Sequence, residues 1–177
     1  MTMRVVAGEL GGRKLVAPEG LTTRPTTDRV REALFNSLDA RGLLDGAVVV
    51  DLYAGSGALG IEALSRGAAR CTFVERDRGA LHALRENIAS LRIADRCTVV
   101  TSDVIAWLPA ARNIDIALID PPYTFDAWPQ LLERLHAHYA VCESGREVPP
   151  PPGWSTWRAK RYGRTWSTVL ERDGDES

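Results

Sequence analysis

The stretch AVVVDLYAGSGALGIEALSRG, residues 47–67, decides the fold. It opens with an apolar run (47–53) that predicts a buried strand, and it closes with a short helical pattern (58–67) that stops at Gly67. The glycine-rich turn between them, DLYAGSGALG (51–60), allows backbone N–H groups to approach a ligand at the N-terminus of a helix. The stretch therefore predicts a strand–turn–helix unit with a binding site at its turn.

Outward from this unit, strands and helices alternate along the middle of the chain. The expected strands are 70–75, 97–101, 114–120 and 140–143, and the expected helices are 79–91, 104–110 and 127–139. This alternation predicts an α/β fold with a doubly wound, mostly parallel sheet and right-handed crossovers. A length of 177 residues suits one domain, 1–177, with a single core.

The N-terminal end departs from this pattern. Residues 1–24 alternate weakly around a glycine-rich turn, which predicts a small N-terminal β-hairpin arm. The core, 25–172, then begins with a helix that Thr26 or Thr27 can cap and that Gly42 can close.

The C-terminal end also departs from it. A proline-rich spacer (148–154) precedes two segments around Tyr162–Gly163, which predict an antiparallel hairpin on the sheet edge. With this hairpin the sheet has seven strands. Residues 173–177 are expected to be a disordered tail.

Composition narrows the possible classes of protein. Hydrophobic content of 45% and charged content of 25% are ordinary for a globular protein, and no apolar run approaches the ~20 residues of a membrane span. The N-terminus lacks the apolar core of a signal peptide, so a cytoplasmic protein is expected. The cysteines Cys71, Cys97 and Cys142 form no metal-ligand pattern with the histidines, so we expect reduced thiols and no metal.

Charge is distributed unevenly although the net charge is only −1. Residues 1–31 and 154–172 are basic, whereas residues 32–153 are acidic. This pattern fits an acidic catalytic body with basic ends that bind a polyanion, although a solvated surface with chance asymmetry fits the charge equally well. The candidate RNA-binding residues are Arg4, Arg13, Lys14, Arg24, Arg29, Arg158, Lys160 and Arg161.

The glycine turn matches the dinucleotide fingerprint G-x-G-x-x-G at Gly55, Gly57 and Gly60, with Glu75 at the spacing of a ribose contact. A nicotinamide- or flavin-dependent oxidoreductase is therefore one reading. However, a carboxylate at Asp51 suits a cationic group, such as the amino-acid end of S-adenosylmethionine, better than a phosphate. Asp103, which follows the expected strand 97–101, can bind an adenine amino group or cap a helix.

The motif IDPPY (119–123) follows the strand 114–120. A nucleobase amine is a poor nucleophile because its lone pair is delocalised into the ring. Asp120 and the carbonyl of Pro121 can each accept one amine proton, which localises that lone pair toward a methyl donor. Pro122 stiffens the turn, and Tyr123, with or without Phe125, offers a face on which a flipped base can stack.

Together these segments resemble the RsmD-type methyltransferases, which methylate the N2 amine of a guanine in bacterial small-subunit ribosomal RNA. The resemblance covers nearly the whole chain and rests on RVVAGELGGRKL (4–15), RPTTDRVREALFNSL (24–38), DLYAGSGALGIEALSRGA (51–68) and IDPPY. It implies a Rossmann-like class I methyltransferase fold, S-adenosylmethionine as donor, and 16S ribosomal RNA in small-subunit particles as partner. Residues 144–153 depart from the family pattern because they are short and proline-rich.

The resemblance also implies a role for each matching residue. In the donor site it places Asp51, Tyr53, Ala54, Gly55, Ser56 and Gly57, with Glu75 and Arg76 at the ribose, Asp103 and Val104 at the adenine, and Thr26 and Asn36 closing the pocket. In the catalytic site it places Asp120, Pro121, Pro122 and Tyr123 around the guanine amine.

Three other functions stay open at this point. DPPY also serves adenine-N6 methyltransferases, but a chain of 177 residues leaves no room for the added recognition domain that such DNA enzymes usually carry. An oxidoreductase would leave DPPY and the basic ends unexplained. Intact Asp51 and Asp120 speak against a non-catalytic RNA-binding module. We expect a monomer.

Overall fold

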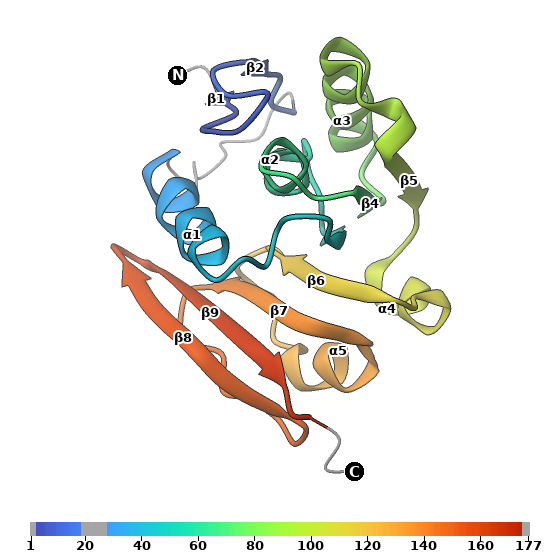
Figure 1. Ribbon diagram of the computed structural model, residues 1–177. Coiled ribbons are helices and arrows are strands. Elements are labelled where there is room, and N and C mark those ends of the chain that lie inside the picture. The colour runs from blue at the N-terminus through green and yellow to red at the C-terminus, as the bar shows by residue number, and fades with distance from the viewer. Residues whose placement is uncertain (1–2, 19–27, 175–177) are drawn as a thin grey trace.

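The computed structural model describes residues 3–18 and 28–174 (Figure 1). Most of these residues belong to nine strands, five α-helices and two short 3-10 helices, η1 and η2. In chain order the elements are β1 (Met3–Arg4), β2 (Lys14–Leu15), α1 (Asp28–Ala40), β3 (Val48–Leu52), α2 (Ala58–Ser65), β4 (Arg70–Glu75), α3 (Arg78–Leu91), η1 (Ala94–Arg96), β5 (Cys97–Thr101), α4 (Val104–Trp107), η2 (Leu108–Ala110), β6 (Ile114–Ile119), α5 (Trp128–Arg134), β7 (Ala137–Ser144), β8 (Trp154–Tyr162) and β9 (Thr165–Arg172).

The main sheet has seven strands in the order β5-β4-β3-β6-β7-β9-β8. The first five strands are parallel, and β9 joins β7 and β8 by antiparallel pairing. The chain builds outward from β3 to β5, returns to β6 beside β3, and then builds outward on the other side. Ligands of such sheets bind at the carboxyl ends of the strands where this reversal occurs. The predicted α/β sheet with its antiparallel end is confirmed.

Helices cover both faces of the sheet (Figure 1). Leu34 of α1, Ile61 of α2 and Leu84 of α3 belong to the core cluster on one face. On the other face, α4 and α5 contribute Val104 and Leu131 to a second cluster. Because neighbouring residues of a strand point to opposite faces, a strand buried on both sides reads as a continuous apolar run.

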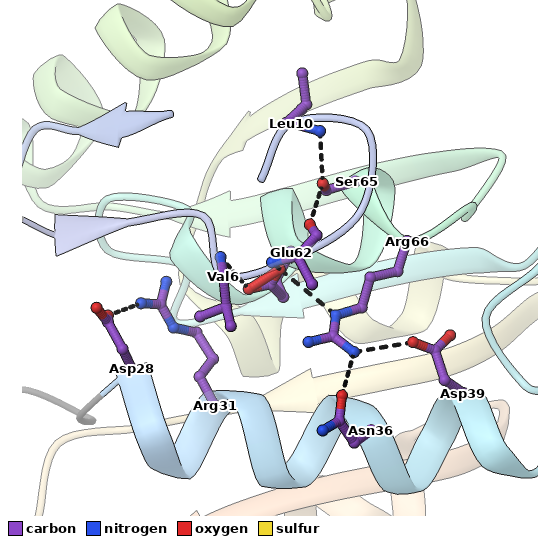
Figure 2. A network of polar contacts seen from close by, with 10 residues as sticks. Val6, Leu10, Asp28, Arg31, Asn36, Asp39, Glu62, Ser65 and Arg66 are labelled. Carbon is purple, nitrogen blue, oxygen red and sulfur yellow. Dashed lines mark hydrogen bonds and ion pairs between the residues drawn. The ribbon is translucent and has the colours of Figure 1, made fainter. Parts of the chain in front are cut away.

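The predicted N-terminal hairpin is confirmed, and its described residues are docked on the core. β1 and β2 pair antiparallel, and the loop between them lies against α2. The carboxylate of Glu62 accepts hydrogen bonds from Val6 N (2.8 Å) and Ala7 N (3.3 Å), while Ser65 Oγ accepts one from Leu10 N (2.9 Å) (Figure 2). Ser65 also packs so tightly on Gly8 that an added Cβ there would lie 2.0 Å from its carbonyl oxygen. The hairpin is therefore a fixed part of the domain.

The expected helix over 127–139 is wrong in its second half. It stops at Arg134 because Leu135 adopts extended backbone angles (φ −80°, ψ 125°), and β7 already begins at Ala137. The guanidinium of Arg172, on β9, donates to the carbonyls of Leu135 and Ala137 and so holds this segment against the hairpin. Tertiary contacts overrule the helical spacing of the local leucines.

Other predicted boundaries differ by a few residues. The strand expected over 47–53 ends at Leu52, because Tyr53 turns the chain with a positive φ of 58°. The helix expected over 58–67 ends at Ser65. The helix expected over 104–110 divides into α4 and the 3-10 turn η2, where a proline stands near the start of the turn.

The C-terminal hairpin follows the prediction, with its turn at 163–164. Trp154 is 4% exposed and donates its indole N–H to the carbonyl of Leu132 (3.2 Å), so it packs the hairpin onto the core. Asp173, expected in the disordered tail, is held by hydrogen bonds to Gly153 and Ser155. Among the described residues, no helix is long and apolar enough to cross a membrane.

Candidate active site at the carboxyl edge of the sheet

The glycine turn after β3 needs its three glycines for two different reasons. Gly55 and Gly57 have positive φ angles of 58° and 87°, a conformation that favours glycine. Gly60 lies where α2 crosses β4, and an added Cβ would lie 2.4 Å from a ring carbon of Phe73 and 2.7 Å from Cys71 Sγ. At Gly55, by contrast, an added Cβ would meet no described atom within 4 Å, so the turn opens toward free space there.

Asp51 lies beneath this turn and is 1% exposed. Its Oδ2 accepts a hydrogen bond from Gly60 N (2.9 Å), which joins the strand to the first turn of α2. Burial raises the pKa of this carboxyl well above its ordinary value, and the negative charges of Asp120 and Glu75 raise it further. The protein therefore keeps an acid where its charge is unfavourable, which is typical of functional sites.

Glu75, at the end of β4, fixes the shape of the turn. Its Oε1 accepts from Gly55 N (2.9 Å), and its Oε2 accepts from Arg76 N (2.8 Å) and Asp77 N (2.9 Å). A carboxylate has room for about four such bonds, so these three leave room for about one more on Oε1. That capacity fits one hydroxyl of a ribose.

Asp103 makes the helix-capping contact that the sequence allows. Its Oδ2 accepts from Ala106 N (3.0 Å) at the start of α4, and its Oδ1 lies 3.6 Å from Arg76 Nη1. Of the neighbouring predicted residues, Val104 is buried, whereas the side chain of Arg76 is 75% exposed. If Asp103 also binds an adenine amino group, its carboxylate must accept that hydrogen bond in addition to the one from Ala106 N at the start of α4.

Tyr53 links the glycine turn to the loop that follows β6. It has a left-handed backbone (φ 58°), which is costly for a bulky residue and is concentrated at functional sites. Its ring packs edge-on against Phe125 (5.5 Å between centroids), and Phe125 packs in the same way on Trp128 (5.1 Å). Burial raises the pKa of the Tyr53 phenol to about 12, with a smaller effect from Asp103.

The DPPY motif begins where β6 ends, on the strand beside β3. In the parallel pairing of β3 with β6, Leu118 lies opposite Asp51. Side chains two residues apart on a strand point to the same face, so Asp120 lies on the same face of the sheet as Asp51, two residues further toward the carboxyl edge. The motif forms one wall of a small pocket, and Tyr123 is 57% exposed at its rim. The residues that line the pocket are Pro121, Pro122, Tyr123, Phe125, Trp128, Glu143 and Ser144.

Glu143 is a site residue that the sequence analysis missed. Val141 of β7 pairs with Leu118 of β6, so Glu143 lies level with Asp120 on the neighbouring strand, and it is 2% exposed. The sequence could have pointed to Glu143, because it is an acid at the end of an expected strand, as Glu75 is. No motif surrounds it, however. Four carboxylates, Glu75, Asp51, Asp120 and Glu143, thus follow one edge of the sheet on one face.

One predicted donor-site residue, Asn36, lies elsewhere. Asn36 Oδ1 accepts from Arg66 Nη1 (2.9 Å), and Arg66 Nη1 also lies 2.9 Å from Asp39 Oδ2 (Figure 2). The structure therefore places Asn36 in the contact between α1 and the end of α2 and does not bring it to the glycine turn. Thr26, the other residue expected to close the pocket, lies outside the described residues.

The predicted RNA-binding residues occupy two separate regions (Figure 1). On the N-terminal hairpin, Arg4, Arg13 and Lys14 are exposed, and Arg4 Nη1 donates to Gly12 O (3.0 Å) while Arg13 Nη2 donates to Ser90 O (3.1 Å). Arg29, on α1, is also exposed. Arg24 lies outside the described residues. On β8, at the other end of the sheet, Arg158 is half-buried, Lys160 lies over the ring of Tyr162 (5.3 Å), and Arg161 Nε donates to Gly163 O (2.8 Å).

Residues 3–18 and 28–174 contain no cluster of His, Cys, Asp and Glu that could hold a metal ion. Cys71, Cys97 and Cys142 are free thiols. The edge presents carboxylates, a glycine turn and aromatic rings.

The strand order, the helices on both faces and the acid-lined glycine turn define the class I methyltransferase fold. A solved structure from Escherichia coli, described as a methyltransferase named yhhF, has a TM-score of 0.84 and 35% identity, and covers 99% of this chain and 100% of its own. Magnesium protoporphyrin IX methyltransferase from Synechocystis, solved with bound S-adenosylmethionine, has a TM-score of 0.67 at 15% identity over 82% of this chain and 79% of its own, and shows the same fold.

The chain belongs to the family described as Conserved hypothetical protein 95, whose model matches residues 3–171. This is the RsmD family, as the resemblance implied. One relative, Ribosomal RNA small subunit methyltransferase D from Escherichia coli, is 36% identical over 97% of this chain and 90% of its own length. The protein of the same name from Haemophilus influenzae is 31% identical over 91% of this chain and 89% of its own length.

Proposed function

We propose that this chain is an S-adenosylmethionine-dependent methyltransferase that methylates the exocyclic N2 amine of one guanine in 16S ribosomal RNA. The observation that carries the proposal is the register of β3 against β6. It puts Asp120, the acceptor for a base amine, one pleat above Asp51 and beside the glycine turn. A base held at the pocket of Pro121 and Tyr123 would therefore lie next to a donor held at the turn.

The described residues fit the donor. Gly55 leaves open space beside its backbone, Glu75 retains about one acceptor position for a ribose hydroxyl, and Asp51 supplies the negative charge that suits a cationic ligand. When bound, S-adenosylmethionine supplies a methyl group on a positively charged sulfur, which is transferred by direct displacement. A donor of this kind explains the acids at the edge better than a nicotinamide cofactor with its phosphates would.

The chain's own residues activate the amine by orienting it. Asp120 and the carbonyl of Pro121 each accept one N–H of the amine, which leaves the nitrogen lone pair directed toward the donor. Pro121 has no backbone N–H that could compete for the carboxylate, and Tyr123, which is exposed at the rim, stacks on the base. The proton released after transfer passes to solvent.

The names of the relatives support the RNA substrate. Both the Escherichia coli and the Haemophilus influenzae relatives are named as methyltransferases of small-subunit ribosomal RNA. The basic N-terminal hairpin and strand β8 present cations at two ends of the domain (Figure 1). Such cations position folded RNA through its phosphates, while the pocket selects the base.

The experiment is a methylation assay on unmodified small ribosomal subunits and on naked 16S ribosomal RNA, with the product nucleosides identified by mass. N2-methylguanosine supports the proposal, and N6-methyladenosine would keep the mechanism but refute the guanine assignment. In parallel, stabilisation against heat by S-adenosylmethionine but not by NAD separates a methyltransferase from an oxidoreductase.

A pair of variants tests the role of Asp120. Asp120→Ala is expected to lower methyl transfer by roughly a hundredfold or more, because the amine is no longer held in line, while donor affinity stays within about twofold. Asp126→Ala, at an exposed acid further along the same loop, is the matched control and is expected to keep full activity. An equal loss of donor affinity in Asp120→Ala would place Asp120 in the donor site and contradict the mechanism.

A further inference from the structure

Asn87, on α3, joins the glycine turn to the chain that leaves the N-terminal hairpin. It is 0% exposed, and its amide makes three hydrogen bonds to two backbone segments. Asn87 Oδ1 accepts from Val16 N (2.7 Å), while Nδ2 donates to Val16 O (3.0 Å) and to Ser56 O (3.0 Å). Both amide N–H groups and the amide oxygen are therefore used.

The contact with Ser56 bears directly on the shape of the turn. Ser56 stands between Gly55 and Gly57, the two residues with left-handed backbone. Holding the Ser56 carbonyl fixes the plane of the peptide that it shares with Gly57, whose N–H donates to Ala54 O (2.8 Å). Asn87 thus fixes the peptide group that lies next to Gly55, where the turn opens to free space.

The contact with Val16 bears on the hairpin. Val16 directly follows β2, and the hairpin is otherwise attached to the two helices that flank the turn: to α2 through Glu62 and Ser65 (Figure 2), and to α3 through Arg13 and Ser90. Gly57 of the turn is the N-cap residue of α2, which begins at Ala58. A shift of the hairpin would therefore reach the turn through Asn87.

We propose that Asn87 is a positioning residue that couples donor binding at the glycine turn to RNA binding by the N-terminal hairpin. This inference rests on the proposed function, because it assigns S-adenosylmethionine to the turn and ribosomal RNA to the hairpin. Coupling between two binding sites is reciprocal, so RNA must tighten donor binding by the same factor by which the donor tightens RNA binding.

The test compares the dissociation constant of S-adenosylmethionine with and without saturating small-subunit RNA, measured by calorimetry on the full chain. In the unaltered protein we expect RNA to tighten donor binding by roughly fivefold or more. In Asn87→Ala this factor is expected to fall toward one, and donor binding without RNA is expected to weaken several-fold. Asn87→Asp, which keeps the acceptor for Val16 N but loses both donors, is expected to behave like the alanine variant.

Leu91→Ala provides the control for a merely structural role. Leu91 is a core residue further along α3 with 4% exposure, so its truncation destabilises the same helix without removing the amide bonds. The proposal is supported if Asn87→Ala loses the coupling between donor and RNA binding while Leu91→Ala, which lowers the melting temperature to a similar extent, keeps it. Equal coupling in the two variants would overturn it.

Val16→Pro keeps the test decisive if Asn87→Ala does not fold. Val16 is 42% exposed, so replacing its side chain leaves the core unchanged. Proline has no backbone N–H and therefore removes the hydrogen bond from Val16 N to Asn87 Oδ1. Unchanged coupling in Val16→Pro would overturn the inference. If the unaltered protein binds no donor at all, the proposed function itself fails, and that outcome is distinct from donor binding without coupling.

Discussion

Replacing Gly60 by alanine tests whether the third glycine of the turn exists for packing. Gly60 is the third residue of α2, and its N–H donates to Asp51. A Cβ there would lie 2.4 Å and 3.0 Å from two ring carbons of Phe73, and 2.7 Å from Cys71 Sγ. Both side chains are at most 1% exposed, so neither can move aside without disturbing the core.

Two opposing effects determine the magnitude. Alanine in place of glycine favours a helix by up to about 1 kcal/mol. Overpacking of a dense core costs about 1–3 kcal/mol, and contacts as short as 2.4 Å belong at the upper end of that range. The net expectation is a loss of about 2–3 kcal/mol, or roughly 4–12 °C in melting temperature for a chain of this length.

Gly79→Ala is the matched control, because Gly79 lies in the first turn of α3 and is exposed. An added Cβ there would meet Asp77 Oδ2 at 3.4 Å, an ordinary contact, so this variant is expected to be as stable as the unaltered protein or up to about 1 kcal/mol more stable. Thermal unfolding of both variants is the assay. A Gly60→Ala variant at least as stable as the unaltered protein would refute the packing argument.

Further predictions concern single groups. Asp51→Asn is expected to raise stability at neutral pH, because it removes a buried charge next to Asp120 and Glu75, and to weaken S-adenosylmethionine binding. Folding raises the pKa of Asp51 above its ordinary 3.8, so the unfolded chain binds fewer protons than the folded one, and the free energy of unfolding falls as pH rises from about 4 through the raised pKa. Asp51→Asn is expected to lack this fall in denaturant titrations from pH 4 to 8. A pH profile identical to that of the unaltered protein would contradict the expectation. Arg92→Gly, at the left-handed residue (φ 57°) that ends α3, is expected to raise stability by about 0.5–1 kcal/mol in urea unfolding, and a loss would show that the arginine side chain matters more than its backbone.

The central fold could be predicted because local and tertiary signals agree there. The strand expected over 70–75 matches β4 at both ends, and DLYAGSGALG leads from a strand into a helix as expected. Parallel strands buried on both faces leave a simple apolar signature, and the glycines leave another. These features are encoded within a few residues.

The end of α5 could not be predicted for the opposite reason. Leu131, Leu132 and Leu135 have helical spacing, but the backbone leaves the helix at Leu135, where Arg172 of β9 binds the local carbonyls. That interaction joins residues far apart in sequence, and no local pattern announces it. The docking of the N-terminal hairpin on Glu62 and Ser65 is of the same kind.

The candidate site was predicted where a motif marks it and missed where only the register does. Asp120 stands beside two prolines, Asp51 lies four residues before Gly55 of the glycine turn, and Glu75 lies at the ribose-contact spacing from Gly55. Glu143 has no such neighbours, and it becomes visible only because β7 pairs in register with β6. Asn87 was missed because a single buried amide in a helix has no sequence signature.

The row of carboxylates at the carboxyl edge argues that this edge is built for binding rather than for stability. Asp51 is almost fully buried, and burial and neighbouring acids raise its pKa, so the charged form of this carboxyl is unfavourable in the free protein. A protein retains such a conflict where a ligand resolves it. Under the proposed function, a donor with a cationic sulfonium and amino group would offset the negative charge near Asp51, and a base amine would donate its protons to Asp120. On that proposal, the charge that is unfavourable at Asp51 in the free protein becomes complementary to the bound donor, beside the residue that holds the base amine.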